Sequence, residues 1–196
     1  MTKKLSIIFL LLAVVTPMAA YADVNMQPKT ASEWRDYLQY RRTQTLDQLF
    51  KVEPEARDEI NKAKGYATFT SLNVNLIFAS VTSGRGILHE NSFFGGKDTY
   101  MRMAQGGLGL GMGVKDFRVV FIFEDQQVID KFLTGGWTFG GEADAAFKGG
   151  DTGAAKSGAI AVAPGLKVYQ LTQSGLALQA TVHGSKYWRD PFVNGD

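Results

Sequence analysis

Apolar and aromatic side chains recur at roughly helical spacing in the first part of the chain and predict a long helix. They are Trp34, Tyr37, Leu38, Leu46, Leu49 and Phe50. Thr30 and Glu33 fit a capping box, which places the start of this helix. Pro54 ends it and suits the first turn of a second helix, which runs to about Lys64. Gly65 follows as a favourable residue just beyond a helix C-terminus.

After Gly65 the pattern changes to short apolar runs of strand length, separated by glycine, proline and polar residues. Residues 83–86 and 91–98 are expected to be turns, and Asp125 is expected to cap one short helix. About eight strands follow two helices, so we expect an α+β fold in which the helices pack on a mainly antiparallel, strongly curved or barrel-like, Gly-rich sheet. The strands are expected at 66–69, 76–81 resuming at 87–89, 100–114, 117–123, 137–147, 159–163, 167–171 and 176–182.

Glycine at positions 107, 109, 111 and 113 alternates with large apolar residues at the centre of the predicted sheet. A period of two places the large side chains on one face of a strand and leaves the other face bare. Glycine within a strand indicates that something packs close against the backbone. Lys115-Asp116 is expected to turn the chain, so that 117–123 forms a buried partner strand in a central hairpin. The bare face fits either close packing within the sheet or a cavity for a lipid chain or another ligand.

The N-terminus has the features of a secretory signal peptide. Lys3 and Lys4 precede an apolar run, and Ala20-Tyr21-Ala22 fits a small-x-small cleavage site before Asp23. We therefore expect a mature N-terminus at Asp23 and a protein that is periplasmic or secreted, with peripheral membrane contact as a further option. The sequence has no cysteine, which excludes disulfides and a lipoprotein anchor.

The expected organisation is a signal peptide at 1–22, an N-terminal helical segment at 23–64 and a Gly-rich β domain at 65–196, with 54–64 joining that domain as one unit. Signal-peptide cleavage removes two of the 21 Lys and Arg residues and none of the 19 Asp and Glu residues. The mature charges then balance, so an electrostatic partner must be recognised by a local patch of charge.

The sequence offers no recognisable set of catalytic residues. Gly96-Lys97-Asp98 lacks the hydroxyl group of a phosphate-binding loop. No serine lies in a Gly-x-Ser-x-Gly elbow. His89 and His183 are far apart and have no metal-ligand spacing around them. We therefore expect no enzyme, no catalytic residue, no cofactor, no metal site and no nucleic-acid partner.

Basic residues that lie among aromatic ones are typical of a membrane interface. The first predicted helix carries such a group, and a second basic group follows at the end of the next helix. Alternatively, the aromatic residues of the first helix pack on the sheet while its arginines face solvent. The candidate lipid-binding residues are Arg41, Arg42, Lys62, Lys64 and Arg85, and the candidate membrane-contact residues are Trp34 and Tyr37.

Arg85 stands out because Gly84 and Gly86 flank it in the predicted turn. Small neighbours leave a guanidinium group accessible to phosphate oxygens, which it binds well. A side chain on a surface turn contributes little to folding, so Arg85→Gln is expected to change stability very little.

The order of several short motifs resembles the SYLF-domain family, whose members occur in yeast actin-patch proteins, plant FYVE-associated proteins and bacterial secreted proteins. The resemblance covers nearly all of the chain after the predicted signal peptide. Its motifs are Glu55-Ala56-Arg57, Lys62-Ala63-Lys64-Gly65-Tyr66-Ala67, Ser83-Gly84-Arg85-Gly86-Ile87-Leu88, Gly107-Leu108-Gly109-Leu110-Gly111-Met112-Gly113, Phe117-Arg118-Val119-Val120-Phe121-Ile122, Val128-Ile129-Asp130-Lys131-Phe132-Leu133, Trp137-Thr138-Phe139-Gly140-Gly141-Glu142-Ala143-Asp144 and Ser174-Gly175-Leu176-Ala177-Leu178.

The resemblance implies binding to anionic phospholipids, which in the eukaryotic members are phosphoinositides. Some eukaryotic members also bind actin, but a signal peptide separates this chain from cytosolic partners, so actin binding is not carried over. The expected function is a non-enzymatic lipid-binding module of the cell envelope or the secreted space. The alternative is a structural or interaction module of the envelope that docks a protein partner and has no lipid affinity.

Overall fold

The computed structural model describes residues 28–72, 81–93, 95–106, 118–134, 137–138, 160–172, 175–176 and 185–196. The predicted signal peptide and the alternating glycines at 107–113 lie outside the described residues. No helix within the described ranges is long and apolar enough to cross a membrane.

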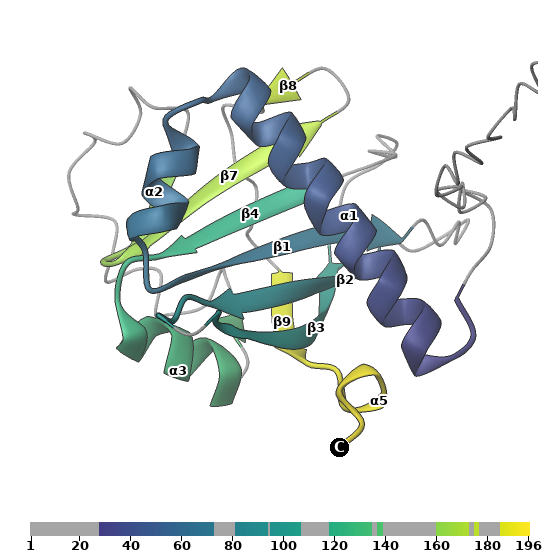
Figure 1. Cartoon of the computed structure of the whole chain (residues 1–196). Coiled ribbons are helices and arrows are strands. Elements are labelled where there is room, and N and C mark those ends of the chain that lie inside the picture. The colour runs from purple at the N-terminus through teal and green to yellow at the C-terminus, as the bar shows by residue number, and fades with distance from the viewer. Residues whose placement is uncertain are drawn as a thin grey trace, which may run out of the picture.

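The N-terminal part of the described chain forms two helices, α1 (Ala31–Val52) and α2 (Ala56–Lys62). The predicted capping box is confirmed, because the Thr30 side chain accepts a hydrogen bond from the Glu33 backbone N–H and the Glu33 carboxylate accepts one from the Thr30 N–H. Such a cap satisfies two backbone donors that would otherwise lack partners at the helix start. Both helices lie across the same face of the sheet (Figure 1).

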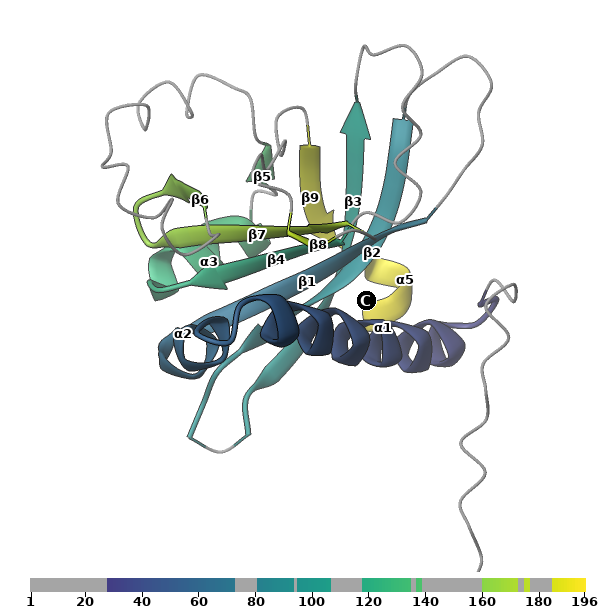
Figure 2. The ribbon, with the colours of Figure 1, turned by 90° about the horizontal axis from the view of Figure 1, so that it is seen from above.

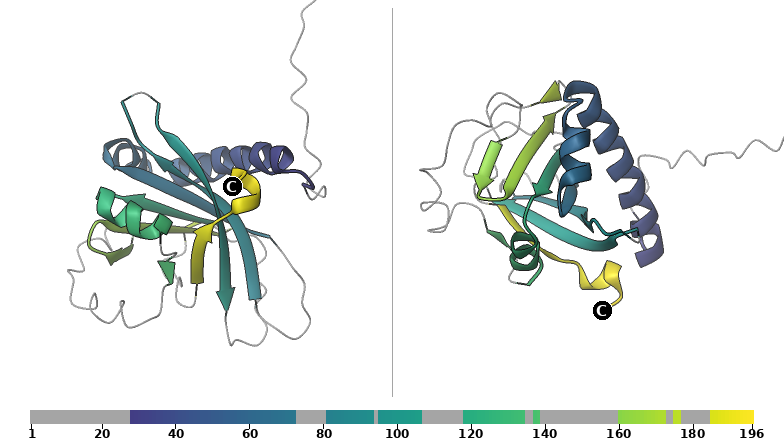
Figure 3. Two further views of the ribbon diagram at one scale, coloured as in Figure 1. Left: turned by 90° about the horizontal axis from the view of Figure 1, so that it is seen from below. Right: turned by 60° about the vertical axis from the view of Figure 1, so that its left-hand side comes forward.

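In the part of the chain that the structure describes, nine strands form one sheet with all paired strands antiparallel, in the order β5-β9-β3-β2-β1-β4-β7-β6, and β8 pairs with β7. The α+β class with a curved antiparallel sheet is therefore confirmed. The sheet curls away from the layer formed by α1 and α2 (Figure 3). The strands are β1 (Gly65–Leu72), β2 (Val81–Glu90), β3 (Lys97–Gly106), β4 (Arg118–Phe123), β5 (Trp137–Thr138), β6 (Ile160–Ala163), β7 (Leu166–Thr172), β8 (Gly175–Leu176) and β9 (Ser185–Arg189).

The predicted central hairpin between the Gly-rich strand and residues 117–123 is wrong. β4 lies between β1 and β7, and each of its residues pairs with both neighbours. Both edges of β4 are therefore occupied, by β1 on one side and β7 on the other. β3 pairs instead with β2 and β9.

β4 is buried on both of its faces, which explains why its sequence is apolar without alternation. Val119, Phe121 and Phe123 face a core that is closed by α3 (Gln126–Thr134). Val120 and Ile122 face the second core, beneath α1 and α2. The predicted short helix and its cap at Asp125 are confirmed, since the Asp125 carboxylate accepts a hydrogen bond from the Gln127 N–H.

The chain ends in a short helix, α5 (Pro191–Asn194), that lies against the start of α1. Val193 of this helix packs with Trp34 and Leu38 of α1 and with Ile87 of β2 in a third, smaller core. The Arg35 Nε donates a hydrogen bond of 2.8 Å to the Val193 carbonyl oxygen. The C-terminus thus joins the first half of α1 to the middle of the sheet.

Candidate functional site

The residues that the sequence proposes for lipid contact form two separate groups. The inner group lies where α1 and β2 face each other, and the outer pair lies exposed at the end of α2 and just beyond it. The inner group comprises Trp34, Tyr37, Arg41, Arg42 and Arg85, and the outer pair comprises Lys62 and Lys64.

Arg85 lies in the middle of β2, so the predicted turn at 83–86 is wrong. β2 pairs along this stretch with β1 on one side and β3 on the other, and Arg85 is opposite Thr70 and Arg102. Pairing on both sides keeps the backbone extended through both glycines. Gly84 and Gly86 are therefore not turn residues. They leave room for the backbone of the neighbouring strand β1, which approaches them closely.

The Arg85 guanidinium is engaged inside the protein rather than open to a headgroup. Its Nε lies 2.7 Å from Asp190 Oδ2, and its Cζ lies 3.9 Å from the centroid of the Trp34 ring. The side chains of Arg85 and Asp190 are 13% and 1% exposed. Arg102 Nε approaches the same carboxylate oxygen at 3.7 Å. Arg85 therefore connects α1, β2 and the C-terminal segment.

Trp34 is only 7% exposed, which corrects the prediction that it contacts a membrane. It packs on the sheet because its ring covers the Arg85 guanidinium, and its other neighbours in the third core are apolar. Tyr37 is half-buried and meets the Trp34 ring edge-on, with 5.8 Å between the ring centroids. Trp34 and Tyr37 thus follow the alternative in which the aromatic residues of α1 pack inside the protein, whereas Tyr40 of the same helix is 50% exposed.

Arg41 and Arg42 are also held by internal partners. The Nη2 of Arg41 donates to Thr70 Oγ1 at 2.9 Å, and the Nη1 of Arg42 lies 2.9 Å from Asp98 Oδ1. Together with Arg85, both line a cavity of about 10 Å³ beneath α1. This volume accommodates about one water molecule and is far too small for a phospholipid headgroup.

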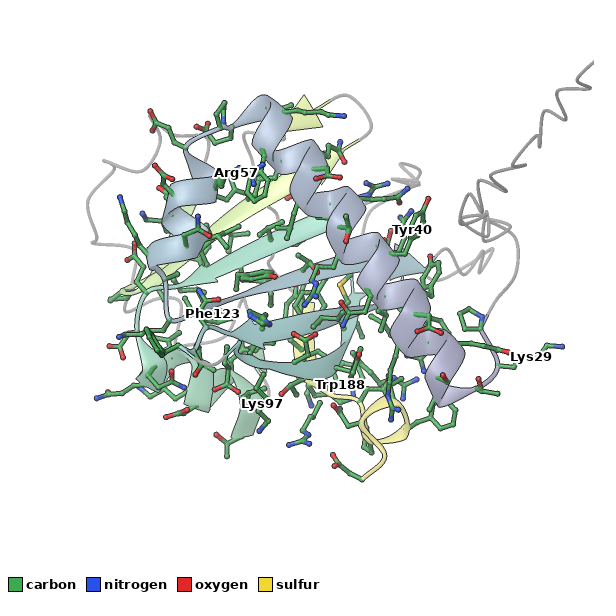
Figure 4. The ribbon with its side chains drawn as sticks, viewed as in Figure 1. Lys29, Tyr40, Arg57, Lys97, Phe123 and Trp188 are labelled. Atoms are coloured by element: carbon green, nitrogen blue, oxygen red, sulfur yellow. The ribbon has the colours of Figure 1, made fainter. Side chains whose placement is uncertain are left out.

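A third exposed lysine, Lys97, joins the outer pair, and no sequence pattern identifies it. Lys97 begins β3 and is exposed, and Figure 4 shows it at the lower edge of the molecule. We call Lys62, Lys64 and Lys97 the lysine group. Within the described ranges, none of the three takes part in an ion pair.

Asn91 links this group to the β2–β3 hairpin. Its backbone N–H donates to the Lys64 carbonyl oxygen at 2.8 Å, and its side-chain Nδ2 donates to the carbonyl oxygens of Ile60 and Ala63, each at 2.9 Å. These bonds satisfy carbonyl groups at the C-terminal end of α2, which the helix itself leaves without partners. They fix the end of α2 against the base of the hairpin.

Phe93 is the residue of this region that sequence reasoning missed. It lies in the loop that connects β2 and β3, and its side chain is 98% exposed. The glycines and polar side chains of residues 91–98 predict only a polar turn. The signal that could have identified it is Phe93-Phe94, since two adjacent aromatic residues are unusual in such a turn.

No family model matches the chain. The chain is 35% identical over 177 residues to "Beta cell expansion factor A" of Aeromonas veronii, and the match covers 88% of this chain and 64% of that protein. The chain thus spans a little less than two thirds of the length of this relative. The resemblance to the SYLF-domain family stays a prediction.

Asp98 is the centre of a polar network between α1 and the hairpin. Its carboxylate lies 2.9 Å from Arg42 Nη1 and 2.6 Å from His89 Nδ1, and it accepts a hydrogen bond of 2.7 Å from Gln39 Nε2. Partial burial on its own raises the pKa of Asp98. The hydrogen bonds from His89 and Gln39 and the charge of Arg42 outweigh burial and lower this pKa to about 2. Among the described residues, no cluster of His, Asp and Glu is suited to a metal ion.

The lowered pKa of Asp98 predicts a loss of stability in acid. A carboxylate with a lowered pKa stabilises the fold above its ordinary value of 3.8 and loses this contribution as the pH falls towards 2. Asp98→Asn is therefore expected to lower the free energy of unfolding at pH 7 by roughly 1–2 kcal/mol and to flatten its decline between about pH 4 and pH 2. Urea unfolding at several pH values measures both effects. Asp58→Asn, at an exposed position of α2, is the control and should leave the decline unchanged.

Proposed function

We propose that this chain binds anionic phospholipid surfaces in the periplasm or the secreted space, without catalysing a reaction. The observation that carries the proposal is the exposed lysine group, which lies beside an exposed phenylalanine at the hairpin. The sequence predicts headgroup contact for Lys62 and Lys64, and their exposure is compatible with that role. The arginines of the inner group act instead within the protein.

The lysine group has the chemistry of a headgroup site. Within the described ranges the three ammonium groups form no ion pair with a carboxylate, so each can attract lipid phosphates. Each lysine near an anionic membrane surface contributes about 1 kcal/mol to binding. Lys62 and Lys64 extend from a backbone that is fixed on both sides, since the Lys64 N–H donates to the Phe123 carbonyl oxygen and the Lys64 carbonyl accepts from Asn91. Their position relative to Lys97 is therefore set by the fold.

The name of the Aeromonas relative refers to an effect on beta cells and specifies no ligand. The proposal therefore rests on the residues of this chain and on the resemblance of its motifs to a lipid-binding family.

The test is co-sedimentation of the mature protein with vesicles of phosphatidylcholine alone and of phosphatidylcholine mixed with phosphatidylglycerol. The parent is expected to bind only the anionic vesicles and to bind less as salt rises, because salt screens the attraction. The double variant Lys62→Gln and Lys64→Gln should bind at least tenfold more weakly at low salt, from a loss of about 2 kcal/mol.

The matched control replaces two exposed lysines outside the group, Lys29 and Lys186, with glutamine. This control should lose much less affinity than the double variant. An equal loss in both variants would show that net charge, rather than the lysine group, governs binding. Failure of the parent to bind anionic vesicles would contradict the proposal and favour an envelope module that docks a protein partner.

A further inference from the structure

The loop that connects β2 and β3 carries the most exposed large apolar side chain among the described residues. Phe93 is 98% exposed, whereas the next most exposed, Phe192, is 53% exposed. An isolated exposed apolar residue needs no explanation in general. Phe93 differs because it lies at the end of a projecting hairpin whose base is joined to Lys64 through Asn91 and is followed by Lys97. We call the described residues 91–93 and 95–96 the hairpin tip.

The hairpin tip extends beyond the layer of α1 and α2 (Figure 2). Its shape depends on two glycines in the left-handed region, Gly95 with φ 107° and Gly96 with φ 77°. The Gly95 N–H also donates a hydrogen bond of 3.1 Å to the Ser92 carbonyl oxygen. The three bonds from Asn91 to the end of α2 hold the base of the tip. The projection is thus built into the fold.

The same contacts place the lysine group at the base of the projecting tip. The Lys64 carbonyl oxygen accepts a hydrogen bond from the Asn91 N–H. Lys62 is the last residue of α2, and Lys97 directly follows the tip. With lysines at the base and a phenylalanine at the tip, the hairpin matches the layers of an anionic bilayer surface, in which phosphates lie outside and apolar chains lie inside.

We propose that the hairpin tip inserts Phe93 into the interfacial region of an anionic bilayer while the lysine group binds the phosphates around it. This inference rests on the proposed function and adds the element and the apolar contact by which the membrane is engaged. Insertion is shallow, because the backbone N–H and C=O groups of the tip need water or headgroup partners and are too costly to bury in hydrocarbon.

A bilayer fits the hairpin tip better than a protein partner does. A stable protein interface buries about 1,200–2,000 Å² in total, whereas one aromatic side chain offers roughly 150–250 Å². The apolar surface of Phe93 alone is thus too small to hold a protein, but it is sufficient to add to the attraction between lysines and phosphates.

The experiment compares Phe93→Ser with the matched control Phe192→Ser on vesicles of phosphatidylcholine with phosphatidylglycerol. Both positions are exposed, so neither change should affect the fold, and urea unfolding verifies this. Phe93→Ser is expected to bind roughly tenfold more weakly, which is the effect of losing most of one apolar side chain from the membrane. The loss should persist at high salt, unlike that of the lysine variants. Phe192→Ser should bind as the parent does.

A label on the tip reports insertion directly. The chain has no cysteine, so Ser92→Cys accepts a single environment-sensitive fluorophore, and Thr43→Cys on an exposed position of α1 serves as the control. Only the label at position 92 should move to an apolar environment when vesicles are added.

The outcomes separate the two proposals. If the parent does not bind the vesicles, the proposed function fails and the inference fails with it. If the parent binds, but Phe93→Ser binds equally well and the label at position 92 does not respond, the inference alone is overturned. An equal loss in Phe93→Ser and Phe192→Ser would also overturn it, because the tip would then have no special role. A label that responds to a protein partner and not to vesicles would assign the tip to protein docking.

Discussion

Replacing Asp190 by alanine is expected to lower the free energy of unfolding by about 3–5 kcal/mol. Asp190 is fully buried, and its carboxylate lies 2.7 Å from the Nε of Arg85. The same carboxylate caps α5 by accepting a hydrogen bond from the Val193 N–H. Removing it leaves a largely buried guanidinium without its carboxylate partner and leaves the last helix without its cap.

Chemical denaturation of parent and variant in urea measures this effect. Arg85→Gln should also be strongly destabilising, because it leaves the Asp190 carboxylate buried without its closest partner. This expectation reverses the one drawn from the sequence, in which Arg85 was placed on a surface turn. Asp196→Ala is the control, since it removes an exposed ion pair with Arg189 that contributes only about 0–1 kcal/mol. Equal unfolding midpoints for Asp190→Ala and Asp196→Ala would contradict the structural role of Asp190.

The start of α1 and the α3 cap could be predicted because capping is local. Thr30 and Glu33 are three residues apart and contact each other directly, as the sequence pattern requires. Asp125 and Gln127 are equally close in sequence. The position of β4 was not predictable in the same way, because its neighbours β1 and β7 lie far from it in sequence. A continuous apolar run indicates burial but does not specify the adjacent strands.

The role of Arg85 was misjudged for the same physical reason. Its closest partner, Asp190, is 105 residues away in sequence, so no local pattern identifies it. Gly84 and Gly86 resemble turn residues when considered alone. In the sheet they instead allow β1 and the side chains of neighbouring strands to lie close to the β2 backbone.

The place of Lys62 and Lys64 could be predicted, because lysine is favoured at and near the C-terminus of a helix. The adjacent hairpin tip was not anticipated, because the loop between β2 and β3 is separated from α2 by all of β1 and β2. The contacts of Asn91 bring these segments together. The proposed site therefore depends on tertiary structure, even though two of its lysines, Lys62 and Lys64, are recognisable in the sequence.

Gly86→Val is expected to destabilise the protein by about 3 kcal/mol or more, because it combines overpacking with a backbone shift. A Cβ at position 86 would overlap the Thr68 carbonyl oxygen of β1 and would lie 2.5 Å from Cδ1 of Phe69. Phe69 is buried in the main core against Phe121 and Tyr187, so its ring has no room to move aside. β1 and β2 would have to separate to admit the new side chain.

Urea unfolding of Gly86→Val and of the control Gly95→Ala tests this packing argument. Gly95 has φ 107°, but a Cβ there would meet no atom within 4 Å. Its replacement should therefore cost only the backbone term of about 1–2 kcal/mol for a left-handed residue. A similar or smaller loss in Gly86→Val would show that β1 does not pack closely on β2 at this position. A much larger loss would establish that glycine is required here to let the two strands meet beneath α1.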